Sequence, residues 1–85
     1  MNLLNIGFGN FVSEERIVTM LSPESAPIKR MVRHAAEEGS LVDASFGRKT
    51  MTVIIADSGH IILSSLLPEA IYSQGTQKTE RTTDE

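Results

Sequence analysis

The sequence has no cysteine, no tryptophan and few aromatic residues: three phenylalanines and one tyrosine among 85 positions. Without cysteine the chain forms no disulfide and offers no thiolate to zinc, which suits a cytoplasmic protein. No apolar run reaches the ~18–20 residues that span a bilayer, so no membrane partner is expected. With so few aromatics, the core is predicted to consist mainly of isoleucine, leucine, valine and methionine.

Positive charge is also scarce, because the formal net charge is −3 at pH 7. That balance argues against a uniformly basic nucleic-acid binder, but not against one that gathers its basic residues on one face. These residues fall into small groups: Arg16; Lys29, Arg30 and Arg33; Arg48 and Lys49; Lys78 and Arg81. A domain this small has a thin core and often gains stability by self-association.

Large apolar side chains are missing from residues 75–85, GTQKTERTTDE. Such a segment cannot offset the entropy lost on ordering, so it is predicted to be a disordered polar tail. Residues 1–74 are predicted to form a single domain.

One helix is predicted with clear limits, within SPESAPIKRMVRHAAEEG. Ser25 is a good N-cap, Pro27 fits the first turn, and Gly39 is a natural stop. The apolar residues recur at the spacing of a buried helical stripe. That stripe consists of Ile28, Met31, Val32 and Ala35.

The other apolar segments are interpreted as strands, at residues 2–8, 16–21, 41–46, 50–56 and 60–66. Val42, Ala44 and Phe46 alternate and are predicted to share one face of their strand.

Turn residues connect these strands. Asp57-Ser58-Gly59 predicts a tight hairpin between the last two. Gly47-Arg48-Lys49 is interpreted as another hairpin-like connection with two adjacent cations at its tip, and residues 67–74 as a short helix. The pattern predicts a small α+β domain, a mostly antiparallel sheet with one main helix packed on it.

Three motifs that suggest catalysis or ligand binding have simpler structural interpretations. Asp57, Ser58 and His60 are neighbours in a turn, whereas the members of a catalytic triad meet through the fold. His34 and His60 lack metal-ligand spacing, so no metal, other cofactor or small-molecule substrate is predicted. Residues 7–9, Gly-Phe-Gly, lack the third glycine of a dinucleotide loop and are interpreted as a turn that needs glycine.

The basic groups leave two interpretations open. Residues 29–33 could belong to a DNA-reading helix, but no second helix lies nearby in the sequence. A solvated face with Arg33 paired to Glu37 is therefore favoured. Arg48 and Lys49 are more informative, because cations on a projecting loop can reach phosphates or base edges. From the residues alone, a solvated loop is still slightly favoured.

Five segments occur in an order that resembles a known family. They are NIGFGN at 5–10, SPESAPIKR at 22–30, FGRKT at 46–50, DSGH at 57–60 and LPEAI at 67–71. They are similar to the marks of the RemA (extracellular matrix regulatory protein A) family, and the tail lies outside the match. The resemblance implies a bacterial DNA-binding activator of biofilm-matrix transcription. It also implies a LytTR-like α+β fold whose subunits assemble into closed rings.

The resemblance also implies a site. Arg16 matches a basic position implicated in DNA binding, and Arg48 and Lys49 match an adjacent pair of arginines. Lysine keeps the charge of arginine but lacks its planar fork. Met51 stands where a further basic residue is common in the family. A ring would repeat one cationic site many times, so that weak contacts to double-stranded DNA add up.

The predicted function is therefore that of a ring-forming, nucleoid-associated transcriptional regulator that binds DNA through Arg16, Arg48 and Lys49. The alternative is a protein-interaction scaffold without direct DNA binding. An enzyme is the third class, and the sequence offers no assembled acid, base or nucleophile for it.

Overall fold

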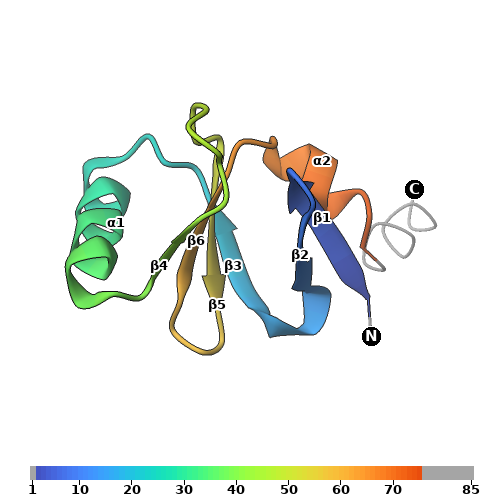
Figure 1. Ribbon diagram of the computed structural model, residues 1–85, viewed down its shortest axis with the longest axis horizontal. Helices are drawn as coiled ribbons and strands as arrows, with labels where there is room; N and C mark the ends of the chain where they lie inside the picture. Colours follow the sequence, from blue (N-terminus) through green and yellow to red (C-terminus); the bar gives the residue numbers. More distant parts are fainter. Residues whose placement is uncertain (1, 76–85) are drawn as a thin grey trace.

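The computed structural model describes residues 2–75. A four-stranded sheet lies in the middle, with a helix on one face and a two-stranded hairpin with a short helix on the other (Figure 1). This arrangement confirms the predicted small α+β architecture with mostly antiparallel strands and one main helix.

The elements follow one another along the chain in a simple order. They are β1 (Leu3–Gly7), β2 (Asn10–Ser13), the 3-10 helix η1 (Glu14–Arg16), β3 (Ile17–Leu21), α1 (Ala26–Glu38), β4 (Leu41–Asp43), β5 (Thr52–Ala56), β6 (Ile61–Ser64) and α2 (Pro68–Tyr72). The central sheet has the order β3-β5-β6-β4, and β1 pairs with β2 in a separate sheet. Strand β2 was not among the predicted elements.

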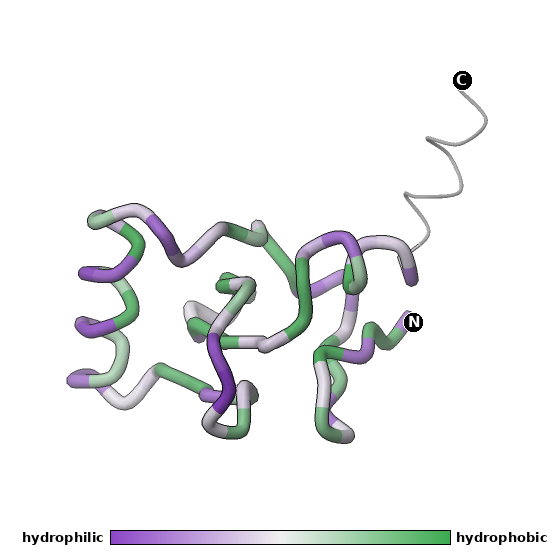
Figure 2. Tube along the Cα trace, turned by 90° about the horizontal axis from the view of Figure 1, so that it is seen from above, coloured by the Kyte–Doolittle hydropathy of each residue, from purple (hydrophilic) through white to green (hydrophobic). Residues whose placement is uncertain are grey.

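Helix α1 begins and ends where the sequence predicts. The Ser25 hydroxyl accepts a hydrogen bond from the Ile28 amide at 3.4 Å, and Gly39 closes the helix in the left-handed region with φ 81°. The predicted stripe packs against the sheet. Ala35 is buried there in a hydrophobic cluster with Val53, Ile61 and Leu63. Seen from above, the hydrophobic side of α1 faces the sheet and its hydrophilic side faces outward (Figure 2).

The central sheet is covered on both faces. On β5, Val53 packs in the cluster beneath α1, whereas Ile54 packs in the cluster beneath the β1–β2 hairpin. Successive side chains of a strand point to opposite faces, so a strand covered on both sides needs a continuous apolar run. The buried hydrophobic residues are all aliphatic, and every phenylalanine is exposed.

Buried hydroxyl groups tie the hairpin to the sheet. The Ser64 hydroxyl donates to the Ile6 carbonyl at 2.8 Å and accepts from the Leu66 amide at 3.1 Å. The Thr52 hydroxyl donates to the Leu66 carbonyl at 2.7 Å. These bonds fix the end of β6 and the residues after it relative to β1.

The chain beyond α2 is anchored on β1. The Gln74 side-chain amide accepts from the Asn5 N–H at 2.8 Å and donates to the Asn5 carbonyl at 2.9 Å, as a neighbouring strand would. Gly75 is buried beside Glu14. Residues 76–85, the remainder of the predicted polar tail, lie outside the described part of the chain.

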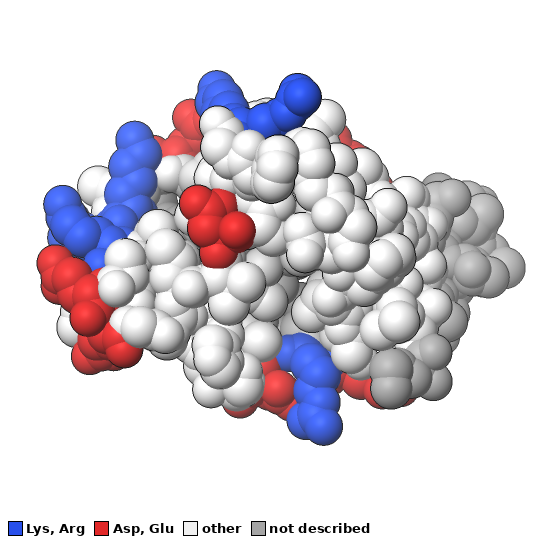
Figure 3. Space-filling view, viewed as in Figure 1, with Lys and Arg blue, Asp and Glu red and all other residues white. Residues whose placement is uncertain are grey.

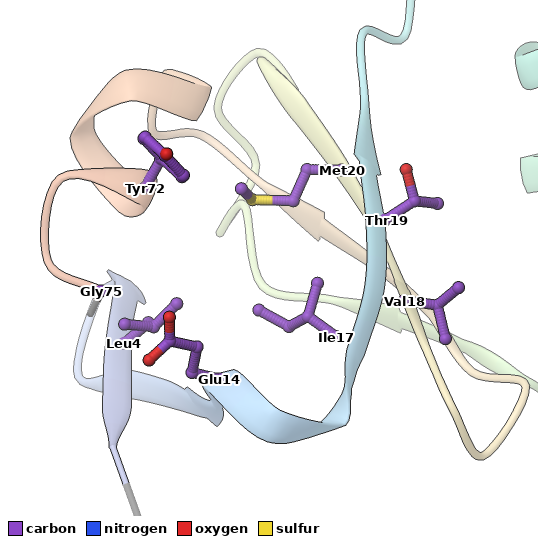
Figure 4. A pocket seen from close by; sticks show the side chains of 8 residues that line it. All are labelled: Leu4, Glu14, Ile17, Val18, Thr19, Met20, Tyr72 and Gly75. Carbon is purple, nitrogen blue, oxygen red and sulfur yellow. The ribbon is translucent and has the colours of Figure 1, made fainter. Parts of the chain in front are cut away.

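A pocket of about 200 Å³ separates β3 from α2 and β1. Ile17 and Met20 point into it, while Val18 and Thr19 point away to the other side of the strand (Figure 4). Its other lining residues are Leu4, Glu14, Tyr72 and Gly75.

The connection between β4 and β5 is not the predicted hairpin. Strand β4 pairs in parallel with β6, and β6 lies between β4 and β5. The Ala44 amide donates to the Leu63 carbonyl at 2.9 Å, and the Met51 amide donates to the Ser64 carbonyl at 2.8 Å. The intervening segment is therefore a crossover that passes the end of β6 and is held there at both of its ends.

The predicted shared face of Val42, Ala44 and Phe46 is also wrong. Ala44 is buried, Val42 is exposed, and Phe46 lies in a turn beyond the end of β4. Strand β4 ends at Asp43, and after Ala44 the chain passes the end of β6 to reach β5.

Candidate nucleic-acid interface

A tight turn carries Arg48 within the crossover. The Arg48 amide donates to the Ser45 carbonyl at 3.0 Å, and the two central residues, Phe46 and Gly47, have φ of 56° and 78°. Positive φ at both central positions is the mark of a type I′ turn, which favours Asn-Gly. A phenylalanine in this conformation costs about 1–3 kcal/mol of backbone strain.

Asp43 anchors the start of this turn. One of its carboxylate oxygens accepts hydrogen bonds from the Ser45 hydroxyl at 2.6 Å and from the Ser45 amide at 3.0 Å. These two bonds hold the pKa of Asp43 below its ordinary value, with the hydroxyl contributing most. The charged form of the carboxylate therefore fixes the first residues of the loop.

The β1–β2 turn repeats the same geometry. Its central residues, Phe8 and Gly9, have φ of 56° and 77°, and Gly7 before them has φ of 108°. The interpretation of Gly7-Phe8-Gly9 as a turn that needs glycine is confirmed, because a φ near 108° strongly disfavours residues with a side chain.

The two turns meet through their aromatic rings. The Phe8 and Phe46 centroids lie 4.9 Å apart with an interplanar angle of 28°, and the Arg48 guanidinium lies 5.6 Å from the Phe8 centroid. This distance is within reach of a cation–π interaction. We call Phe8, Phe46, Arg48 and Lys49 the aromatic–basic end. Three of its members, Phe8, Arg48 and Lys49, line an open hollow.

Lys29 on α1 lies near Lys49 of the crossover. A second hollow is lined by Lys29 and Lys49 together with Pro23, Glu24 and Thr50. The sequence pattern assigned Lys29 to a solvated helix face, and the fold that brings the first turn of α1 beside the crossover was not visible in local patterns.

Arg16 lies elsewhere. Its guanidinium makes an ion pair with Asp57 at 3.1 Å, and the Asp57 amide donates to the Arg16 carbonyl at 2.7 Å. Glu14 and Glu15 precede it in η1. Strand β5 begins three residues after Lys49 and ends directly before Asp57. Its length is roughly 16 Å at the usual rise per residue.

The structure therefore brings Arg48 and Lys49 together and separates both from Arg16. In Figure 3, basic atoms lie at the top, where the crossover runs in Figure 1, and at the bottom, where η1 runs. The surface between them is mostly uncharged but carries one acidic group below the basic atoms at the top.

The other candidate chemistry does not assemble. The Ser58 hydroxyl and His60 Nδ1 share a hydrogen bond of 2.7 Å, but the carboxylate of Asp57 is engaged by Arg16. On α1, His34 Nε2 lies 3.0 Å from a Glu38 carboxylate oxygen at i,i+4 spacing. Among residues 2–75, no cluster of three potential metal ligands occurs, and no helix is long and apolar enough to cross a membrane.

Comparison with known proteins assigns a family. The model of the RemA-like family, described as extracellular matrix regulatory protein A-like, matches residues 3–74. The chain belongs to the RemA-like family. This match confirms the resemblance noted in the sequence.

Close relatives occur in several bacteria, under the name "Putative regulatory protein". The chain is 56% identical to one from Cyanothece sp. over 87% of its own length and 81% of the relative's. It is 51% identical to one from Clostridium novyi, covering 100% and 94% of the two chains. One from Acetivibrio thermocellus is 61% identical, with 84% and 76% covered. These names indicate a regulatory protein rather than an enzyme.

Proposed function

We propose that this RemA-like protein is a DNA-binding transcriptional regulator that acts on biofilm-matrix genes as a closed ring. The proposal includes a LytTR-like mode of folding and a cytoplasmic, nucleoid-associated location. The observation that carries it is the aromatic–basic end, where the exposed Arg48 and Lys49 follow an anchored turn and line one open hollow.

Several properties of this end suit a polyanion. Both cations are exposed, and Lys29 lies beside Lys49. The crossover is held at both ends on β6, so little order has to be gained when a phosphate is bound. An arginine stacked on an aromatic ring keeps its donors free at the edge of its planar fork.

Ring formation is supported by the edges of the central sheet. Strands β3 and β4 are its two outer strands, and each carries an exposed valine, Val18 at 65% and Val42 at 45%. An outer strand offers unpaired backbone groups to another chain. Two different surfaces that bind each other make a heterologous contact, which closes into a ring when the rotation allows.

The direct test of the function is duplex binding across a range of salt concentrations. Affinity measured by fluorescence anisotropy should fall linearly on a log–log plot, with a slope of about −0.9 for each phosphate neutralised. Absence of binding at low salt would contradict the proposal and favour the protein-interaction scaffold. Binding whose affinity does not respond to salt would do the same.

The ring is tested by native mass measurement. The wild-type chain should form one discrete assembly, and Val18→Lys should shift it toward smaller species, because lysine on a strand edge opposes pairing. Glu15→Lys changes charge nearby without altering an exposed apolar side chain and serves as the control. A wild-type chain that remains a monomer at micromolar concentration would contradict the ring.

A further inference from the structure

The exposure of Phe8 and Phe46 is not explained by folding. The chain has three phenylalanines, and all of them lie outside the core. Phe46 is 77% exposed and Phe8 is 47% exposed. Each occupies the first central position of a turn with positive φ, where asparagine would fit with less strain.

The two rings are nevertheless held in a defined arrangement. They stack on each other, and the Arg48 guanidinium lies over Phe8. Phe46 is thus a mostly exposed apolar ring that stacks on Phe8, two residues before Arg48 in the same loop. The stacking of the two rings offsets part of the backbone strain, but neither ring contributes to the core. Backbone strain at an exposed site is typical of a functional position.

We propose that Phe46, supported by Phe8, inserts as a wedge at a base-pair step in the minor groove while Arg48 and Lys49 bind the flanking phosphates. This inference rests on the proposed function and adds the aromatic pair to its site. Minor-groove binding proteins commonly unstack a step with a phenylalanine. Pyrimidine–purine steps such as TA and CA/TG unstack most easily, so they are the preferred targets.

A duplex fits this surface better than a second copy of the chain. Covering Phe46 with protein would also remove water from Arg48 and Lys49, which is costly unless acidic groups face them. A duplex presents apolar base faces and phosphates within the same contact. The Phe46 side chain can therefore stack on a base while the two cations bind phosphates.

The test uses Phe46→Asn in the full chain, with Phe46→Tyr as the matched control that keeps the ring. Phe46→Asn should weaken duplex binding roughly tenfold or more, as removal of one aromatic–base contact does. The slope of log affinity against log salt should stay unchanged, because no charge is removed. The melting temperature should stay equal or rise, because asparagine suits the turn.

A base analogue reports the insertion itself. Wild-type protein and Phe46→Tyr should raise the fluorescence of 2-aminopurine placed at a TA step, whereas Phe46→Asn should not. An unchanged affinity of Phe46→Asn, or no fluorescence change with wild type, would overturn the wedge. A smaller native mass for Phe46→Asn would overturn it as well, because the aromatic ring would then be a subunit contact.

Failure of the wedge and failure of the proposed function give different results. If wild-type protein binds DNA and Arg48→Ala weakens that binding while Phe46→Asn does not, only the wedge fails. If wild-type protein binds no duplex at low salt, the proposed function fails with it.

Discussion

The two ends of β5 hold arginines in opposite surroundings. Before the strand, Arg48 lies over the Phe8 ring next to Lys49 in sequence. Beyond its other end, Arg16 shares an ion pair with Asp57 and follows two glutamates. A guanidinium already paired with a carboxylate must compete with that carboxylate to bind a phosphate. The family resemblance made Arg16 a candidate, and the residues themselves pointed to Arg48. The fold places a carboxylate partner against Arg16 and an aromatic ring against Arg48.

The different surroundings of Arg48 and Arg16 also explain how an acidic protein can present a cationic surface. The formal net charge of −3 is an average over the chain. What a phosphate experiences is the charge within about a Debye length, roughly 8–10 Å in ordinary buffers. Around the aromatic–basic end, Arg48, Lys49 and Lys29 outnumber the nearby carboxylates of Glu24 and Asp43. Around Arg16, the carboxylates of Glu14, Glu15 and Asp57 outnumber the single cation.

The largest effect should come from removing both cations of the aromatic–basic end. Arg48→Ala combined with Lys49→Ala should weaken duplex binding by about a hundredfold or more, because the change removes two cations from every subunit of an assembly. Gel shift or anisotropy measures the affinity, and native mass should stay that of wild type. Arg33→Ala removes one charge from the exposed part of α1 and is the control. If it weakens binding as much, the effect is bulk electrostatics and not a site.

The second prediction concerns the surface around Arg16 and Asp57, where substitutions should change duplex affinity several-fold. Arg16→Ala should weaken duplex binding, as the family resemblance implies, but less than the double variant does. Asp57→Asn should tighten binding, because it releases the Arg16 guanidinium from its ion pair. Equal affinity of both variants and wild type would mean that this end of the subunit does not touch DNA.

A smaller effect is expected from Lys49→Arg. Arginine offers a planar fork that binds phosphate or guanine through two hydrogen bonds, whereas lysine offers a point charge. The affinity should rise by a few-fold, measured against Lys29→Arg as the matched change on the neighbouring helix. No gain at either position would indicate that Lys49 acts through charge alone.

The smallest effect is the pH dependence of the loop. The folded-state pKa of Asp43 is depressed, so its contribution to stability is complete above the unfolded value of about 3.9 and is lost as pH falls through the folded value. The difference in melting temperature between wild type and Asp43→Ala should therefore shrink below about pH 4. A difference that is constant from pH 6 to pH 3 would show that the charge of Asp43 does not anchor the turn.

Local signals predicted much of the fold. Ser25, Pro27 and Gly39 set the limits of α1 within the sequence itself, and Gly59 marked the β5–β6 hairpin. Strand β2 was missed because its turn contains Phe8-Gly9 in place of Asn-Gly, so the usual hairpin signal is absent.

Contacts between segments far apart in the chain could not be predicted from local sequence patterns. A hairpin and a crossover can begin and end with the same turn residues, and only the pairing of β4 with β6 decides between them. For the same reason, no local pattern indicated that Arg16 lies a strand length from Arg48, or that Lys29 lies beside Lys49. The scarcity of aromatics could have drawn attention to the two Phe-Gly turns.

The most direct test of the account is the salt dependence of duplex binding for Arg48→Ala and Arg16→Ala, measured side by side with wild type. We predict that Arg48→Ala reduces the steepness of the log–log slope by about 0.9 for each phosphate that is no longer neutralised, and that Arg16→Ala reduces it by less. A larger reduction for Arg16→Ala, or an unchanged slope for Arg48→Ala, would contradict the claim that the aromatic–basic end binds the DNA backbone.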